Sequence, residues 1–167
     1  MTMKNNNPAA IQEAFQKEFA ETNKWTRAWV EERVCGAVRF ATKLKPRDPK
    51  KLKLVKSIPA ACSVRYEWLE SVIAAAGATF PENLHIPKNY YGELYDFVVD
   101  WLDSVDSTLD RRIIIMRACL LSMNEIGARI GISRQRGSRR HARAIDKLVW
   151  YLNHSEKYKK QPAQGGK

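Results

Sequence analysis

Apolar residues recur at every third or fourth position along most of this chain, a spacing that predicts α-helices. The clearest apolar stripe lies in residues 25–44, and others lie in residues 64–76, 88–104 and 109–121. A shorter stripe in residues 8–21 fits one further amphipathic helix. No stretch alternates apolar and polar residues as a half-buried β-strand would. The pattern therefore predicts an all-α protein.

Prolines, glycines and changes of polarity divide the chain into four parts. Residues 1–24 are an N-terminal segment with room for the short helix, and residues 25–106 are a helical body. Within the body, the stretch 45–57 contains two prolines and six basic residues and is expected to be a loop. Residues 107–153 form a C-terminal helical unit, and the polar, aperiodic residues 154–167 predict a disordered tail.

Two sets of side chains in the body have expected positions. Trp25 and Trp29 fall on the apolar stripe of their helix, so both are expected in the core. The helix expected at 88–104 carries carboxylates on the side opposite its apolar stripe. They belong to Asp96, Asp100 and Asp103, and Asp106 follows just after the end of the helix. Paired carboxylates can hold a metal or act as general acid and base, but no histidine lies near these four. A solvated acidic face is therefore expected, and such a face could also dock a basic partner surface.

The C-terminal unit is built around residues 121–148, where local signals predict two helices and a tight turn. Ser122, followed by Glu125 three residues later, has the form of a capping box. The first helix should therefore run from Met123 to Ile130.

The second helix should follow after a connection of three residues, 131–133. Gly131 can adopt the positive φ that ends the first helix, and Ser133 can cap the second. This is the connection that a DNA-binding helix-turn-helix uses. The second helix opens with five arginines within ten residues: Arg134, Arg136, Arg139, Arg140 and Arg143.

The same stretch resembles the fourth region of bacterial sigma factors, whose pattern is L-[ST]-x-x-E-I-[GA]-x-x-x-G-[VI]-[ST]-R-x-[RT]. The residues that match it without a gap are Leu121, Ser122, Glu125, Ile126, Gly127, Gly131, Ile132, Ser133, Arg134 and Arg136. The resemblance, taken over Leu121–Leu148, implies a helix-turn-helix that reads DNA. The chain departs from the family pattern at Gly137 and Arg140, where sigma factors carry apolar residues. A glycine inside a helix costs about 1 kcal/mol relative to alanine.

In layout, residues 25–153 resemble an uncharacterised domain family of phages and prophage-carrying proteobacteria. The shared features are an early W-V-E-E-R sequence (Trp29 to Arg33), a middle helix that ends in glycine, and a terminal sigma-like helix-turn-helix. This second resemblance implies an N-terminal helical body followed by a C-terminal helix-turn-helix unit. It carries no assigned activity.

Positive charge is concentrated in the C-terminal part of the chain. The net charge is +11; residues 107–167 hold 14 Lys/Arg against 4 Asp/Glu, which is +10, and residues 1–106 hold 15 against 14, which is +1. Only four of the C-terminal cations lie beyond Asn153. A polyanion, double-stranded DNA, is therefore the expected partner of the helix-turn-helix.

Three groups of residues are expected to meet DNA. By the resemblance to sigma factors, the base-reading residues are Arg134, Gln135, Ser138 and Arg139. Residues placed to favour flanking phosphates are Arg136, Arg140, Arg143 and Lys147. A basic arm in the 45–57 stretch could lie along phosphates or in a minor groove, or could be a solvated loop; its residues are Lys45, Arg47, Lys50, Lys51 and Lys53.

Several classes of function are not expected. The chain lacks a phosphate-cradling glycine motif, G-x-S-x-G, H-E-x-x-H and any spaced Cys/His set, so no enzyme, metal or cofactor is predicted. No apolar run is long enough to span a membrane, and the first ten residues do not resemble a secretory signal. The three cysteines are expected to be buried, reduced thiols. A location in the bacterial cytoplasm, associated with the nucleoid, is expected.

The sequence favours a sequence-specific DNA-binding protein that is a phage- or prophage-type transcription regulator, with RNA polymerase as a candidate partner. An alternative is an oligomeric, small-terminase-like subunit that binds DNA during phage packaging, with a homo-oligomer formed through the helical body. A third reading is a protein-docking module whose arginines meet an acidic partner.

Overall fold

The protein is all-α. The computed structural model describes residues 8–22, 24–44, 48–77, 80–81, 84, 86 and 89–158, and this part of the chain contains helices and no strand. The elements are α1 (Pro8–Thr22), α2 (Arg27–Lys43), α3 (Pro49–Ser57), α4 (Ala60–Ala76), α5 (Tyr91–Asp96), the π-helical segment η1 (Phe97–Trp101), α6 (Leu102–Ser104), α7 (Thr108–Ala118), α8 (Met123–Ile130) and α9 (Arg134–His154).

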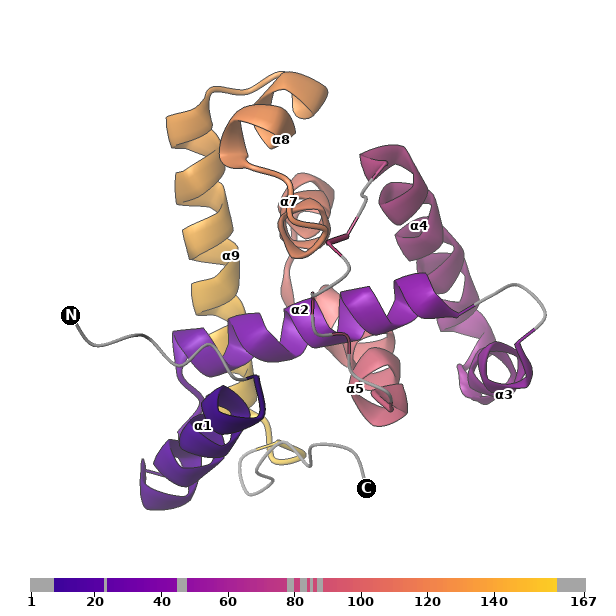
Figure 1. Ribbon diagram of the computed structural model, residues 1–167, viewed down its shortest axis with the longest axis vertical. Helices are drawn as coiled ribbons and strands as arrows, with labels where there is room; N and C mark the ends of the chain where they lie inside the picture. Colours follow the sequence, from indigo (N-terminus) through magenta and orange to yellow (C-terminus); the bar gives the residue numbers. More distant parts are fainter. Residues whose placement is uncertain are drawn as a thin grey trace.

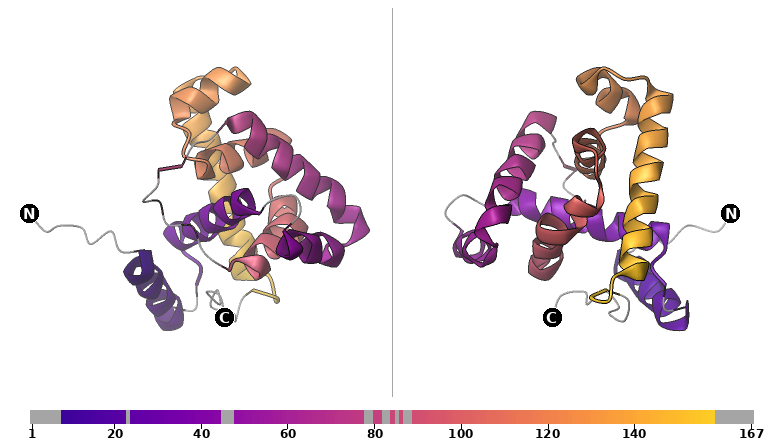
Figure 2. Two further views of the ribbon diagram at one scale, coloured as in Figure 1. Left: turned by 45° about the vertical axis from the view of Figure 1, so that its right-hand side comes forward. Right: turned by 180° about the vertical axis from the view of Figure 1, so that it is seen from behind.

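Helix α2 crosses the centre of the molecule (Figure 1). It contacts α4, α5, α7 and α9, and nine of its 17 residues are buried, so it is an interior helix. The predicted core positions of Trp25 and Trp29 are confirmed, because these residues are 4% and 1% exposed. Helices α3 and α4 lie on one side of the molecule and α9 on the other, as the front and rear views agree (Figures 1 and 2).

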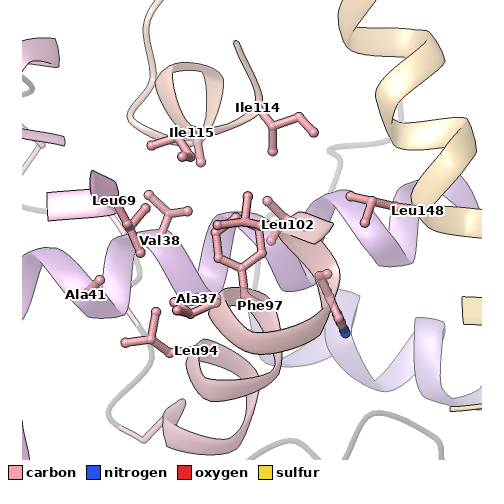
Figure 3. Close-up of a cluster of buried hydrophobic side chains, with 14 of the residues drawn as sticks. Ala37, Val38, Ala41, Leu69, Leu94, Phe97, Leu102, Ile114, Ile115 and Leu148 are labelled. Atoms are coloured by element: carbon pink, nitrogen blue, oxygen red, sulfur yellow. The ribbon is translucent and has the colours of Figure 1, made fainter. Parts of the chain in front are cut away.

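The core is shared by the body and the C-terminal helices. Figure 3 shows Phe97 next to Ala37 and Val38 of α2, and Phe97 is fully buried. The core continues through residues of α4, α7 and α9, among them Leu69, Ile114, Ile115 and Leu148. Because residues before and after position 106 belong to one cluster, the helical body fixes the position of α7 and α9.

A buried ion pair joins α2 to the start of α5. Arg33 Nη2 donates to Glu93 Oε1 at 2.7 Å, and both side chains are more than 90% buried. The Arg33 guanidinium also lies over the rings of Trp29 and Tyr90, each at 5.1 Å from the centroid. Gly36 lets this close contact form, because a Cβ there would lie 2.2 Å from the Tyr90 ring.

The helix expected at 88–104 begins at Tyr91 and widens into a π-helical turn at Phe97–Trp101. The sequence does not predict this turn. A π turn disturbs the regular hydrogen-bond ladder, and Arg65 of α4 supplies donors there. Arg65 Nη1 donates to the carbonyls of Val98 and Val99 at 3.3 and 2.9 Å, and Nη2 donates to Asp103 at 2.7 Å. One guanidinium thus ties α4 to the irregular turn.

The expected loop at 45–57 is wrong from Pro49 onward, because Pro49–Ser57 forms helix α3. Proline is tolerated in the first turn of a helix, where its missing N–H would have no intrahelical partner. Leu54 and Ile58 are buried at 3% and 6% exposure. Burial of these two side chains stabilises a helix in a stretch whose lysines and prolines indicate a loop.

Other helix ends differ from expectation by a few residues. Helix α4 begins at Ala60, although the apolar stripe begins near Val64, and the Ser63 hydroxyl donates to the carbonyl of Ala60 at 2.8 Å. Helix α7 is capped by Ser107 and runs from Thr108 to Ala118, so it ends three residues before the end of the apolar stripe at residue 121. Leu120 has φ +67°, which ends the helix before Leu121.

The expected acidic solvent face is largely occupied by basic residues of the same chain. Lys157 donates to Asp96 and Asp100 at 3.1 and 2.8 Å, and Tyr158 Oη donates to Asp100 at 2.6 Å. Asp103 pairs with Arg65, and Asp106 with Lys147. The prediction of a disordered tail is therefore wrong for residues 154–158, where Tyr158 is buried at 3% exposure. Residues 159–167 lie outside the described part of the chain.

Candidate nucleic-acid interface

Helix α8 begins at the capping box expected at residues 122–125. The N–H of Glu125 donates to Ser122 Oγ at 3.2 Å, and the N–H of Ser122 donates to Glu125 Oε2 at 2.7 Å. These bonds satisfy amide groups that a helix N-terminus otherwise leaves without partners. They also lower the pKa of the Glu125 carboxyl, because Ser122 binds its charged form. The predicted start of this helix is confirmed.

The turn between α8 and α9 has the conformation that the sequence predicts. Gly131 has φ +75°, and the N–H groups of Gly131 and Ile132 both donate to the carbonyl of Gly127, at 2.9 and 3.0 Å. Ser133 Oγ accepts a hydrogen bond from the N–H of Arg136 at 3.2 Å and caps α9. Gly127 lies so close to the turn that a Cβ there would be 2.5 Å from the Ile132 carbonyl oxygen. Backbone contacts therefore fix α9 relative to α8.

Helix α9 is anchored by its rear half. Leu148 and Leu152 are buried at 1% and 0% exposure, and the helix contacts α2, α7 and α8. Near its end, the Asn153 side chain exchanges hydrogen bonds of 2.7 and 3.0 Å with the backbone of Trp25. Asp146 forms an ion pair with Arg27. The front half of α9 lies beside α8, at the top of Figure 1.

The four residues predicted to read bases are exposed together on this front half. Arg134, Gln135, Ser138 and Arg139 occupy adjacent positions on successive turns, so they share one side of the helix. Among the described residues, none of these four side chains has a hydrogen-bond or ion-pair partner. Their polar groups are therefore available to a ligand.

The four residues predicted to meet phosphates differ in their availability. Arg136 and Arg143 are exposed, and neither side chain has an ion-pair partner in the described chain. Lys147 lies 3.4 Å from Asp106, whose side chain is 84% exposed, which makes a weak surface pair. Arg140 instead donates to Asp110 at 2.9 Å, and the Asp110 side chain is only 8% exposed. Arg140 thus pairs with α7 instead of pointing freely into solvent.

Two residues of the expected basic arm, Lys51 and Lys53, have described side chains, and neither is brought to α9. Lys45 and Arg47 lie outside the described residues, as does the side chain of Lys50. Lys51 is 14% exposed and pairs with Glu70 at 2.7 Å. Lys53 is exposed on α3, on the side of the molecule opposite α9 (Figure 2).

Sequence reasoning missed three residues beside the front of α9. A hollow of about 580 Å³ lies between α2, α7, α8 and α9, and its lining residues are Glu31, Arg117, Ser122, Met123, Asn124, Arg134, Ser138 and His141. Glu31, Arg117 and His141 also line an adjoining cavity of about 240 Å³. Burial lowers the pKa of His141, and the positive charges of Arg117 and Arg27 lower it further. No local sequence signal brings α2 to this place; only the tertiary fold does.

Comparisons of the chain with protein-family models, with curated proteins and with solved structures gave no match. Within the described residues, no helix is long and apolar enough to cross a membrane. In the same part of the chain, no group of three His, Cys, Asp or Glu side chains is placed to hold a metal ion.

Proposed function

We propose that this protein is a sequence-specific, double-stranded-DNA-binding protein, and that it acts as a transcription regulator of phage or prophage type. In this proposal, α8 and α9 are a helix-turn-helix, and the front of α9 enters the major groove. The observation that carries the proposal is a set of four exposed guanidinium groups without partners in the described chain. They belong to Arg134, Arg136, Arg139 and Arg143.

Two chemistries at this surface support recognition of base sequence. A guanidinium such as that of Arg134 or Arg139 can bind guanine O6 and N7 with two hydrogen bonds, and Gln135 can bind adenine N6 and N7. The capped turn fixes the direction of α9, so these side chains start from a rigid backbone. Loss of one such contact should cost about 1–3 kcal/mol for the preferred sequence only.

Other cations support binding that does not depend on sequence. Arg136 and Arg143 are free to meet phosphates, and Lys147 gives up only a weak surface pair when it turns to DNA. Arg140 is left out, because its departure would leave the carboxylate of Asp110 buried without a partner.

A selection from a random duplex library tests the proposal. The full chain is expected to enrich one sequence motif, and Arg139→Gln should relax one base preference within it. Lys56→Gln is the matched control, because it removes the same charge from an exposed position on α3, far from α9. Absence of an enriched motif, or equal losses of affinity in both variants, would refute sequence-specific reading by α9.

Light scattering separates the regulator from a packaging subunit. A small oligomer is expected for a regulator, because two-fold related half-sites are the common arrangement of helix-turn-helix proteins. A ring of eight or more subunits would instead favour the small-terminase-like function.

A further inference from the structure

The hollow beside the front of α9 has the composition of an anion site. Arg134 and Ser138, two of the proposed base-reading residues, form one wall, and the start of α8 forms another. Arg117 stands on a third wall, at the end of α7, and Glu31 of α2 on the fourth. The hollow therefore opens on the same side as the residues that would meet DNA.

Arg117 is already oriented at this place. Its Nη1 donates to the carbonyl of Leu121 at 2.9 Å, which holds the guanidinium near the start of α8. The side chain is nevertheless exposed, and its remaining N–H groups have no other partner in the described chain. A guanidinium fixed by one bond loses little freedom when it binds an oxyanion, so Arg117 is preorganised for a phosphate.

His141 is half-buried between the hollow and the adjoining cavity, one turn behind Ser138. From α2 it faces Glu31, Cys35 and Arg39, with Arg27 near by; from α7 it faces Arg117; and its own helix adds Arg134. These four cations outnumber the two carboxylates near by, Glu31 and the Asp146 that pairs with Arg27. Burial and this positive field disfavour an imidazolium in the free protein. A negative charge placed in the hollow would oppose that field.

We propose that the hollow seats one backbone phosphate of bound DNA, held by Arg117, and that His141 takes up a proton from solvent as this phosphate enters. The proposal rests on the proposed DNA-binding function and extends its contact surface from α8 and α9 to α7 and α2. Glu31 is the opposing group, because its carboxylate repels a phosphate in the same hollow.

Variants that remove a charge test whether the hollow binds a phosphate of DNA. Arg117→Gln should reduce the salt slope of DNA binding by about one and weaken binding about eightfold at 0.1 M salt, equally for all sequences. Arg112→Gln is the matched control, because it removes the same charge from α7 outside the lining of the hollow. Glu31→Gln should change affinity in the opposite direction and tighten binding. Equal effects of the two arginine variants, or weaker binding by Glu31→Gln, would overturn the proposal.

The pH dependence of binding tests the role of His141. Affinity for DNA should rise as the pH falls from 8 to 6, by at most tenfold per pH unit for one proton. His141→Gln should bind DNA with no such rise over this range. An equal pH dependence in the wild type and in His141→Gln would refute the proton uptake.

An NMR titration separates this inference from the proposed function. The His141 ring is followed against pH in inorganic phosphate and in chloride at equal ionic strength, and phosphate should raise its pKa. Suppose that duplex DNA binds, but phosphate leaves the His141 pKa unchanged and Arg117→Gln leaves the affinity for DNA unchanged. The hollow then does not bind a phosphate, and the proposed reading of DNA by α9 stands. If phosphate raises the pKa but no duplex binds, the hollow takes free phosphate and DNA reading is wrong.

Discussion

Replacement of two buried glycines of the α8–α9 region by alanine should change the stability of the protein in opposite directions. Gly127 and Gly137 are both helical, so alanine at either position should gain about 1 kcal/mol of helix propensity. Their surroundings differ. A Cβ at Gly137 would lie 3.6 Å from Ile132 Cδ1 and 3.8 Å from Met123 Sδ, which are ordinary contacts. A Cβ at Gly127 would lie 2.5 Å from the Ile132 carbonyl oxygen.

The sign of each stability change depends on whether the atoms that the new Cβ would meet can shift. At Gly137 nothing has to shift, so Gly137→Ala should stabilise the protein by about 1 kcal/mol. At Gly127 the obstructing atom is backbone, in a turn held by the 3.0 Å hydrogen bond from Ile132 N to Gly127 O. Overpacking of this kind costs about 1–3 kcal/mol. The upper end applies to a backbone obstacle, and the propensity gain offsets part of it, so Gly127→Ala should destabilise by about 2 kcal/mol.

Urea unfolding and thermal unfolding, both followed by circular dichroism, measure the changes in free energy and in Tm. In a chain of this size 1 kcal/mol corresponds to about 2–4 °C in Tm. Gly137→Ala should therefore raise Tm by about 2–4 °C, and Gly127→Ala should lower it by about 4–8 °C. Gly127→Ala should also weaken the DNA binding that we propose, because it displaces the turn that directs α9. A Gly127→Ala protein as stable as the wild type, or a destabilised Gly137→Ala protein, would refute the packing described for the turn.

Three further predictions concern stability. Arg140→Met should lower the free energy of unfolding by about 3 kcal/mol, because it strands the buried Asp110 carboxylate; adding Asp110→Asn should recover part of the loss in the same urea assay. Tyr158→Phe should cost about 1.5 kcal/mol through the lost hydrogen bond to Asp100, and an unchanged Tm would mean that residues 155–158 do not stabilise the fold. Because His141 has a folded-state pKa below its ordinary 6.5, its contribution to stability is present above pH 6.5 and lost as the pH falls through the folded value. Urea midpoints at pH 7.5, 6.5 and 5.5 should show this loss in the wild type and less of it in His141→Gln.

The elements that the sequence predicts well are those defined by local rules. The capping box at Ser122, the left-handed Gly131 and the cap at Ser133 all involve residues within four positions of one another. Their geometry depends on backbone chemistry that any helix end shares. The buried stripe that contains Trp29 is also predictable, because periodicity alone places it on one face.

The predictions from sequence fail at positions whose structure depends on residues that are distant in the sequence. Pro49 and its lysine neighbours read as a loop, yet the burial of Leu54 and Ile58 stabilises a helix there. The acidic positions 96 and 100 indicate that some cation could dock, but nothing local identifies Lys157. Arg140 could not be told from its neighbouring arginines, because its partner Asp110 is 30 positions away on α7.

The placement of acidic residues concentrates the unpaired positive charge of α9 at one end of the helix. Its rear cation Lys147 faces Asp106, its middle cation Arg140 is bound to Asp110, and the tail cation Lys157 is held by two aspartates. The four arginines of α9 that have no ion-pair partner in the described chain lie at positions 134–143, in the half beside α8. A composition with the same net charge but with these aspartates elsewhere would spread positive potential along the whole helix and bind polyanions in many orientations. The aspartates at positions 96, 100, 106 and 110 thus confine the electrostatic attraction to one end of α9, which favours a single orientation on the DNA that we propose as its partner.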